Sequence, residues 1–168
     1  MAFNNLIVSA QRGDSRAQAA LYEKYYGDVY RYCAYRVGSL HYAEDLAQDT
    51  FLRFFRYNGD TQLKNTKAYI LKIASNLCTA YLAGHSNTVE LGDSIPATYD
   101  DMTDDQMAVR RAISALPDEY REVIILYYYN NLRTSKIAQM QNIPVSTVKT
   151  RLSRAREKLK TLLIKEGF

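Results

Sequence analysis

Apolar residues recur every three or four positions along most of the chain, and this spacing limits the folds that the chain can adopt. The spacing gives each segment one apolar face, as in amphipathic α-helices that pack against one another. It is clearest in residues 15–37, 41–57 and 66–83. Only 7 Gly and 3 Pro occur among 168 residues, which disfavours the many turns of an all-β chain. We therefore expect an all-α protein.

The helical spacing is lost between residues 84 and 104. This stretch holds two Gly, one Pro and an acidic cluster, and we predict that it is a flexible linker. On either side we expect a small helical domain, a bundle over residues 1–83 and a second domain over residues 105–168. The acidity of the linker either aids solubility or imitates nucleic acid in a basic channel.

The charges divide the chain in the same way. Residues 84–105 carry 6 Asp and Glu and no Lys or Arg, whereas residues 106–168 carry 12 Lys and Arg against 5 Asp and Glu. A basic C-terminal end favours nucleic-acid binding, although a solvated basic helix face has the same composition. The apolar runs are too short to insert into a membrane, and the N-terminus is not typical of a signal peptide. We expect a cytoplasmic protein.

The residues that catalysis or metal binding would need are scarce. The chain has two Cys and two His, which disfavours a Cys/His zinc site or a disulfide framework. No nucleophile–base pair, paired catalytic carboxylates or phosphate-binding loop stands out. We therefore predict no enzymatic activity, no catalytic residue, no metal and no cofactor.

Residues 134–162 have the pattern of a helix-turn-helix. A first helix from Thr134 to Met140 would end at Asn142, a residue type that tolerates the left-handed conformation, and Pro144 prevents its continuation. A second helix, capped by Ser146 or a neighbour, would bury an apolar stripe. Its opposite face carries hydrogen-bond donors suited to phosphates and base edges: Lys149, Thr150, Ser153, Arg154, Arg156 and Lys160. The pattern favours DNA binding over a simple amphipathic hairpin.

The same region resembles domain four of a bacterial RNA polymerase sigma factor, in particular of the extracytoplasmic-function (ECF) group. The matching segment is "LPDEYREVIILYYYNNLRTSKIAQMQNIPVSTVKTRLSRAREKLKTLL". The segments "YAEDLAQDTFLRFF" and "AYILKIASNL" resemble domain two of the same family. The resemblance covers nearly the whole chain, and its two parts come in the family's order. It implies a transcription initiation factor that joins core RNA polymerase and promoter DNA.

The resemblance also implies which residues make these contacts. The helix of domain two that docks on the polymerase β′ clamp would use Asp45, Leu46, Gln48 and Phe51. Core packing is the alternative for Leu46 and Phe51, and Phe51 suits either role equally. Domain two would hold the minus-ten element with Lys67, Tyr69, Lys72 and Asn76. Domain four would meet the β flap and read the minus-thirty-five element with Lys149, Thr150, Arg151, Ser153, Arg154 and Arg156. An anti-sigma factor is a further partner that the resemblance allows.

The chain departs from the family pattern at several positions. Ala80 stands where an Asp is usual, and Ala83, Gly84 and His85 replace a short basic run. Fewer cations mean fewer neutralised phosphates and weaker binding. One alternative is therefore a sigma-like DNA-binding regulator with weakened promoter melting. A second alternative is a helical adaptor protein that sequesters a partner, and its binding would depend little on salt.

Overall fold

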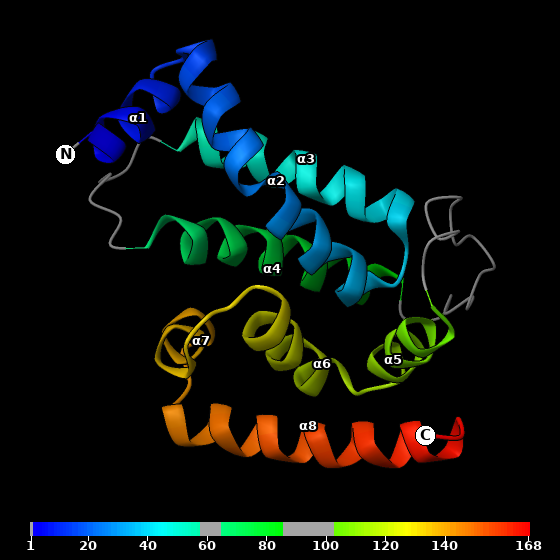
Figure 1. Ribbon diagram of the computed structural model, residues 1–168. Helices are drawn as coiled ribbons and strands as arrows, with labels where there is room; N and C mark the ends of the chain where they lie inside the picture. Colours follow the sequence, from blue (N-terminus) through cyan, green and yellow to red (C-terminus); the bar gives the residue numbers. More distant parts are fainter. Residues whose placement is uncertain (1, 58–64, 86–102) are drawn as a thin grey trace.

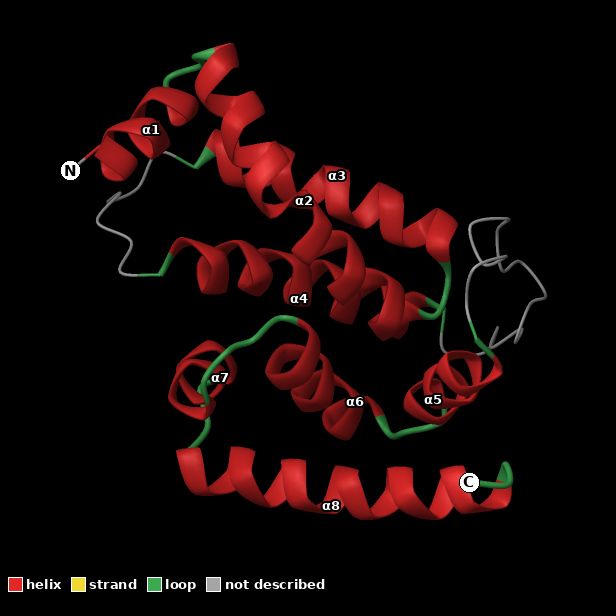
Figure 2. Ribbon diagram, in the orientation of Figure 1, coloured by secondary structure: helices red, strands yellow, loops and turns green. Residues whose placement is uncertain are grey.

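The structure is a computed structural model that describes residues 2–57, 65–85 and 103–168. Within these ranges every regular element is helical and no strand occurs, as Figure 2 shows. The all-α prediction is therefore confirmed. The predicted linker, 84–104, lies almost entirely outside the described residues.

The N-terminal half consists of four helices: α1 (Ala2–Gln11), α2 (Ser15–Val37), α3 (Leu40–Arg56) and α4 (Thr66–Gly84). Helix α2 packs against the other three. Its start is stabilised by Asp14, whose carboxylate accepts hydrogen bonds from the backbone N–H groups of Arg16 and Ala17 at 2.9 and 3.2 Å. The predicted stripe of α2 is buried and includes Leu21, Val29 and Tyr32. In this bundle, α3 and α4 each keep one face at the protein surface.

The C-terminal half consists of α5 (Asp104–Ser114), α6 (Asp118–Ile124), the π-helical turn η2 (Ile125–Tyr129), α7 (Thr134–Gln141) and α8 (Val145–Lys165). Helices α7 and α8 form the expected helix-turn-helix. Asn142 has the left-handed conformation, with φ 54°. Ser146 does not cap α8, because the helix begins one residue earlier, directly after Pro144. The hydroxyl of Thr150 instead donates to the Ser146 carbonyl at 2.9 Å.

The π-helical turn η2 follows α6 without a break in the chain's helical path. The Asn130 N–H donates to the carbonyl of Ile125, five residues earlier, at 3.0 Å. Such single π-helical turns insert an extra residue into a helix and are frequent at functional sites. Here the turn is followed by Asn131 with φ 55°, which leads the chain into α7.

The two halves pack directly on each other. Figure 1 shows α5–α8 beneath α2 and α4, with α6 between the N-terminal bundle and α8. One continuous cluster of buried apolar side chains extends through both halves. Across the boundary, the rings of Tyr35 and Tyr129 stack with their centroids 4.3 Å apart. The sequence did not indicate this contact.

Candidate DNA-binding and polymerase-docking surfaces

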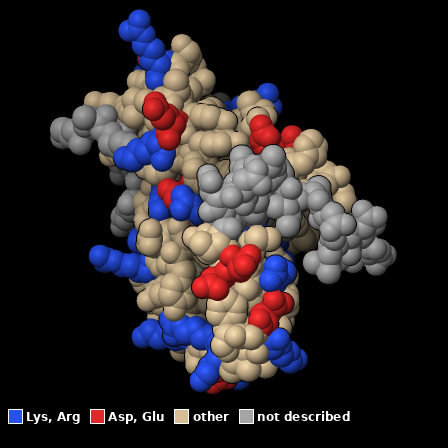
Figure 3. Space-filling view, turned by 45° about the vertical axis from the view of Figure 1, so that its right-hand side comes forward, with Lys and Arg blue, Asp and Glu red and all other residues tan. Residues whose placement is uncertain are grey.

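The outer face of α8 is the clearest candidate for DNA binding. Val148, Leu152 and Ala155 are buried against the rest of the C-terminal half. The opposite face carries four of the predicted residues, all exposed: Lys149, Thr150, Ser153 and Arg154. Figure 3 shows several Lys and Arg side chains along the lower end of the molecule, where α8 lies. This face combines cations for phosphates with donors for base edges.

The other two predicted residues of α8 are held by contacts within the protein. Arg151 is half-buried, and its guanidinium lies 3.6 Å from the carboxylate of Glu119 on α6. Arg156 Nε donates to the Tyr128 hydroxyl at 2.7 Å, and its guanidinium lies 5.7 Å from the centre of that ring. Both side chains therefore flank the open face and help to fix α8 on the domain.

The outer face of α3 carries the residues predicted to dock on polymerase. Asp45 and Gln48 are exposed, and Leu46 is half-buried. Phe51 is different, because only 2% of it is exposed and its ring packs 4.9 Å from that of Tyr22. Phe51 therefore belongs to the core in this structure.

The most exposed of the large apolar residues of α3 is Leu52, which is 53% exposed. It follows Gln48 by four residues and Asp45 by seven, so the three lie along one stripe of the helix. Sequence reasoning missed Leu52 because Phe51 and Leu52 are neighbours of similar apolar character. The helical period from Asp45 could have identified the exposed one.

The predicted minus-ten residues lie on α4, but they do not all share one face. Tyr69, Lys72 and Asn76 follow one another at helical spacing, and Lys72 and Asn76 are exposed. Tyr69 is half-buried, with its ring 5.6 Å from that of Tyr57. Burial, and after it the neighbouring Tyr57, raise the pKa of Tyr69 above its ordinary value, so its hydroxyl stays protonated.

Lys67 points elsewhere, and its ammonium group pairs with the Asp28 carboxylate at 3.5 Å. The departures from the family pattern, in contrast, extend the stripe of Lys72 and Asn76. Ala80 and Ala83 are both exposed and lie on this stripe by helical spacing. The stripe of Lys72, Asn76, Ala80 and Ala83 thus carries one cation, Lys72.

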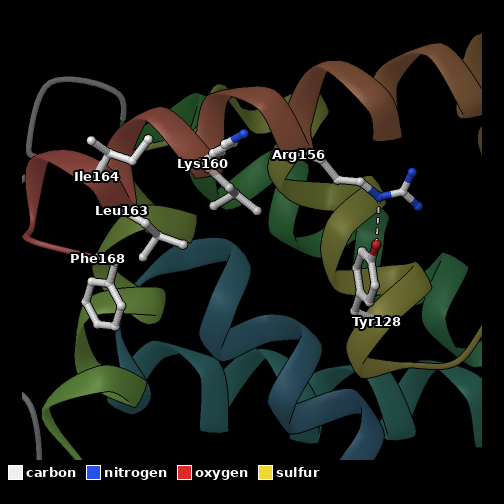
Figure 4. A pocket seen from close by; sticks show the side chains of 7 residues that line it. Tyr128, Arg156, Lys160, Leu163, Ile164 and Phe168 are labelled. Carbon is white, nitrogen blue, oxygen red and sulfur yellow. Dashed lines mark hydrogen bonds between the residues drawn. The ribbon is translucent and has the colours of Figure 1, made fainter.

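An apolar groove lies along the C-terminal end of α8, with a volume of about 470 Å³. Figure 4 shows Leu163, Ile164 and Phe168 at one end, and Tyr128 with its hydrogen bond to Arg156 at the other. Ile164 and Phe168 are more than half exposed. Exposed apolar side chains in one groove are typical of a protein-docking site. The sequence analysis did not single out this groove.

Among the described residues, no group of three or more His, Cys, Asp or Glu is placed to hold a metal ion. The same residues include no helix long and apolar enough to cross a membrane. Cys33 and Cys78 are fully buried as free thiols. The adjacent Cys78, and after it burial, raise the pKa of the Cys33 thiol well above its ordinary value, which makes that thiol unreactive.

The sequence matches two family models, "Sigma-70 region 2" over residues 21–88 and "Sigma-70, region 4" over residues 106–159. The ECF RNA polymerase sigma factor SigW of Bacillus subtilis is 31% identical, over 97% of both chains. SigM of the same organism, also an ECF sigma factor, is 30% identical over 84% of this chain and 92% of its own. The chain belongs to the ECF group of RNA polymerase sigma factors.

Two solved structures resemble this sigma factor in fold. CnrH, solved in complex with the cytosolic domain of CnrY, has a TM-score of 0.77 and 21% identity, over 99% of this chain and 100% of its own. The sigma factor RpoE of Bartonella quintana, solved with the anti-sigma factor NepR, has a TM-score of 0.68 and 23% identity, over 86% of this chain and 95% of its own. The N-terminal bundle is hereafter domain 2, and the C-terminal half domain 4.

Proposed function

We propose that this sigma factor joins core RNA polymerase and directs it to a class of promoters. Domain 2, over residues 1–83, would contact the minus-ten element, and domain 4, over residues 105–168, the minus-thirty-five element. The observation that carries the proposal is the open donor-rich face of α8, presented by a complete helix-turn-helix. Lys149, Thr150, Ser153 and Arg154 are the proposed contacts to duplex DNA, and Arg151 and Arg156 would contact phosphates only after exchanging their present partners.

The stripe of Asp45, Gln48 and Leu52 is the proposed contact to the β′ clamp. The apolar groove beside Phe168 is the proposed contact to the β flap, because it is a second apolar surface on the other domain. A sigma factor that is held at both ends can place both promoter elements relative to the catalytic site of the polymerase. The sigma factor itself would perform no covalent chemistry, and its work would lie in the cytoplasm with the chromosome.

A reconstituted transcription assay tests this proposal. Purified sigma factor and core polymerase are incubated with a library of genomic promoter fragments, and the transcripts are sequenced. We expect initiation at a set of fragments that share two elements, and loss of that set when core polymerase is supplied alone. Fragment-independent initiation, or no initiation on any fragment, would contradict the proposal.

One observation favours a second candidate, a sigma-like regulator that binds DNA but melts promoters weakly. Lys72 and Asn76 lie on an exposed stripe of α4, and the next two residues of this stripe are the uncharged Ala80 and Ala83. The stripe therefore has no cation besides Lys72. Such a regulator would bind duplex DNA with a strong salt dependence and yet give little open complex. A helical adaptor protein would instead show neither property. An anti-sigma factor is a further proposed partner, as in the RpoE–NepR complex.

A further inference from the structure

Both histidines of the chain lie in one aromatic cluster, where the start of α3 meets the end of α4. The ring of Tyr42 lies 5.4 Å from that of His41 and 5.0 Å from that of Tyr81, centre to centre. The ring of His85 stacks on Tyr81, with centres 4.1 Å and planes 17° apart. His85 Nδ1 also donates to the Tyr81 carbonyl at 2.8 Å, which fixes this stack. We call these four residues the aromatic patch.

The aromatic patch is open to solvent. Tyr42 is 43% exposed, His41 and His85 are exposed as well, and Tyr81 is half-buried. An exposed tyrosine offers a large contact area and loses little conformational entropy on binding, and Tyr is among the residues that contribute most to protein interfaces. The composition of the patch is therefore typical of a protein-binding surface.

The aromatic patch continues the outer stripe of α3. His41 precedes Asp45 by four residues, and Gln48 and Leu52 follow Asp45 after three and seven, so the four side chains share one side of the helix. His41 Nε2 lies 4.0 Å from a carboxylate oxygen of Asp45, and the two side chains are 79% and 66% exposed. A partner bound along this stripe would therefore also cover the patch at its end.

The charge around the patch indicates the kind of surface that fits it. Residues 40–52 hold three carboxylates and no Lys or Arg, and two of the three, on Glu44 and Asp45, are exposed beside the patch. Such a face attracts a basic protein surface and repels the phosphates of DNA. Core polymerase, the proposed partner of the α3 stripe, is therefore the occupant that the charge favours.

We propose that the aromatic patch is part of the surface that binds core polymerase, and that protons weaken this binding. The proposal rests on the proposed function of the α3 stripe, and adds contacts and a form of regulation to it. Histidine changes charge between about pH 5 and pH 8. A proton taken up by His41 or His85 adds a positive charge beside the acidic stripe and reduces its attraction to a basic partner. Binding should therefore weaken as the pH falls through this range.

The other ionisable side chains that the structure describes around the two imidazoles are Tyr42, Glu44, Asp45 and Tyr81. Burial, and after it Tyr42, raise the pKa of Tyr81 above its ordinary value, so its hydroxyl stays protonated at neutral pH. Among these residue types, histidine is the one that changes charge between about pH 6 and pH 8. A pH series in this interval therefore reports on the two histidines.

A fluorescence titration with core polymerase, in the absence of DNA, measures the contribution of the patch. The dye is attached to Ala20→Cys, an exposed site of α2, while the buried native thiols stay unlabelled. Tyr42→Ala should weaken binding by about tenfold or more, as expected for an interface tyrosine. Tyr57→Ala is the matched control, because Tyr57 is also 43% exposed and follows the opposite end of α3. It should leave the affinity unchanged.

The same titration between about pH 8 and pH 6 measures the effect of protons. The parent is compared with a double variant, His41→Gln with His85→Gln, in which neither position titrates. The ratio of the two affinities at each pH cancels the titration of the polymerase itself. Over this interval the parent should lose about threefold more affinity than the double variant, since exposed charges interact modestly in water.

Two results would overturn the proposal directly. Equal affinities of Tyr42→Ala and Tyr57→Ala would remove the patch from the polymerase surface, and the same pH dependence in the parent and the double variant would overturn the role of the histidines. A loss in Tyr42→Ala that appears with a single-stranded oligonucleotide and not with core polymerase would make the patch a DNA contact instead. Circular dichroism checks the fold of each variant, and Tyr42→Gln replaces Tyr42→Ala if helix is lost.

The titration also separates this inference from the proposed function. A parent chain that does not bind core polymerase would contradict both. Binding that is lost when Asp45 and Gln48 are both changed to Ala, but kept in Tyr42→Ala, would overturn the aromatic patch alone and leave the proposed function intact.

Discussion

Helices α3 and α8 are built alike and differ in the charge of their open faces. Each lies at the surface of its domain and buries one apolar side, α3 through Phe51 and Phe54 and α8 through Val148 and Leu152. The open face of α3 presents Asp45 and Gln48 with an exposed Leu. The open face of α8 presents the donors and cations Lys149, Thr150, Ser153 and Arg154.

Because the two helices share one architecture, we expect their exposed residues to decide which partner each helix contacts. An acidic and apolar face is repelled by phosphates and suits a protein surface, whereas a basic face is attracted to DNA at long range. Helix α4 is intermediate, with Lys72 as the cation of its exposed stripe. Substitutions on the three helices test these assignments separately.

The two sides of α3 should respond very differently to truncation. Phe51→Ala removes a buried ring and should lower the free energy of unfolding by about 3–5 kcal/mol. Leu52→Ala, at the exposed neighbour, should change it by less than about 0.5 kcal/mol. Chemical denaturation followed by circular dichroism measures both. Equal losses in the two variants would show that Leu52 is also a core residue.

The open face of α3 should decide polymerase binding. Changing both Asp45 and Gln48 to Ala should weaken binding to core polymerase by at least about 2 kcal/mol, the loss typical of central interface residues. The fold should survive, because both positions are exposed. A fluorescence titration with core polymerase gives the affinity, and Glu23→Ala on α2 serves as the control. An unchanged affinity in the double variant would remove this face from the interface.

On α8, Arg154 should distinguish one base sequence from others. Arg154→Ala should cost about 1–3 kcal/mol on the preferred duplex and reduce the preference for it, since Arg reads base edges through paired hydrogen bonds. Binding to preferred and scrambled duplexes is compared at one fixed salt concentration. Lys165→Ala, in the last turn of α8, removes the same charge outside the open face. Equal losses on both duplexes would make Arg154 a phosphate contact.

Adding charge to α4 should make it more like α8. Ala83→Arg with Gly84→Arg should strengthen open-complex formation and steepen its salt dependence by about 1.4 in log–log slope, for two added contacts to single-stranded phosphates. The space for both side chains exists, because Ala83 is exposed and no atom lies within 4 Å of a side-chain carbon built on Gly84.

Permanganate reactivity of unpaired thymines reports the melted strand in this test. Ala19→Arg with Ala20→Arg adds the same charge to α2 and serves as the control. Equal reactivity and equal salt dependence in the parent and the α4 variant would show that the missing cations do not limit melting.

The sequence predicted most helices and much of the candidate sites because these depend on local spacing. The α8 face follows from the period of its apolar stripe, and Asn142 from its tolerance of the left-handed conformation. The same reasoning failed to separate Phe51 from Leu52, because both are apolar and a shift of one position changes which side of the helix is buried. It also failed to separate Lys67 from Lys72, since the pairing of Lys67 with Asp28 involves a different helix.

The helical class, the helix-turn-helix and the family could all be predicted from the sequence, because periodicity, turn residues and motif order are properties of neighbouring positions. The contact between the two domains could not be predicted in this way. Arg36 and Glu122 are separated by more than 80 residues, and each is an ordinary polar residue in its own helix. Their burial together depends on the packing of α6 across α2 and α4. Such a contact arises from the relative placement of helices, which local spacing does not specify.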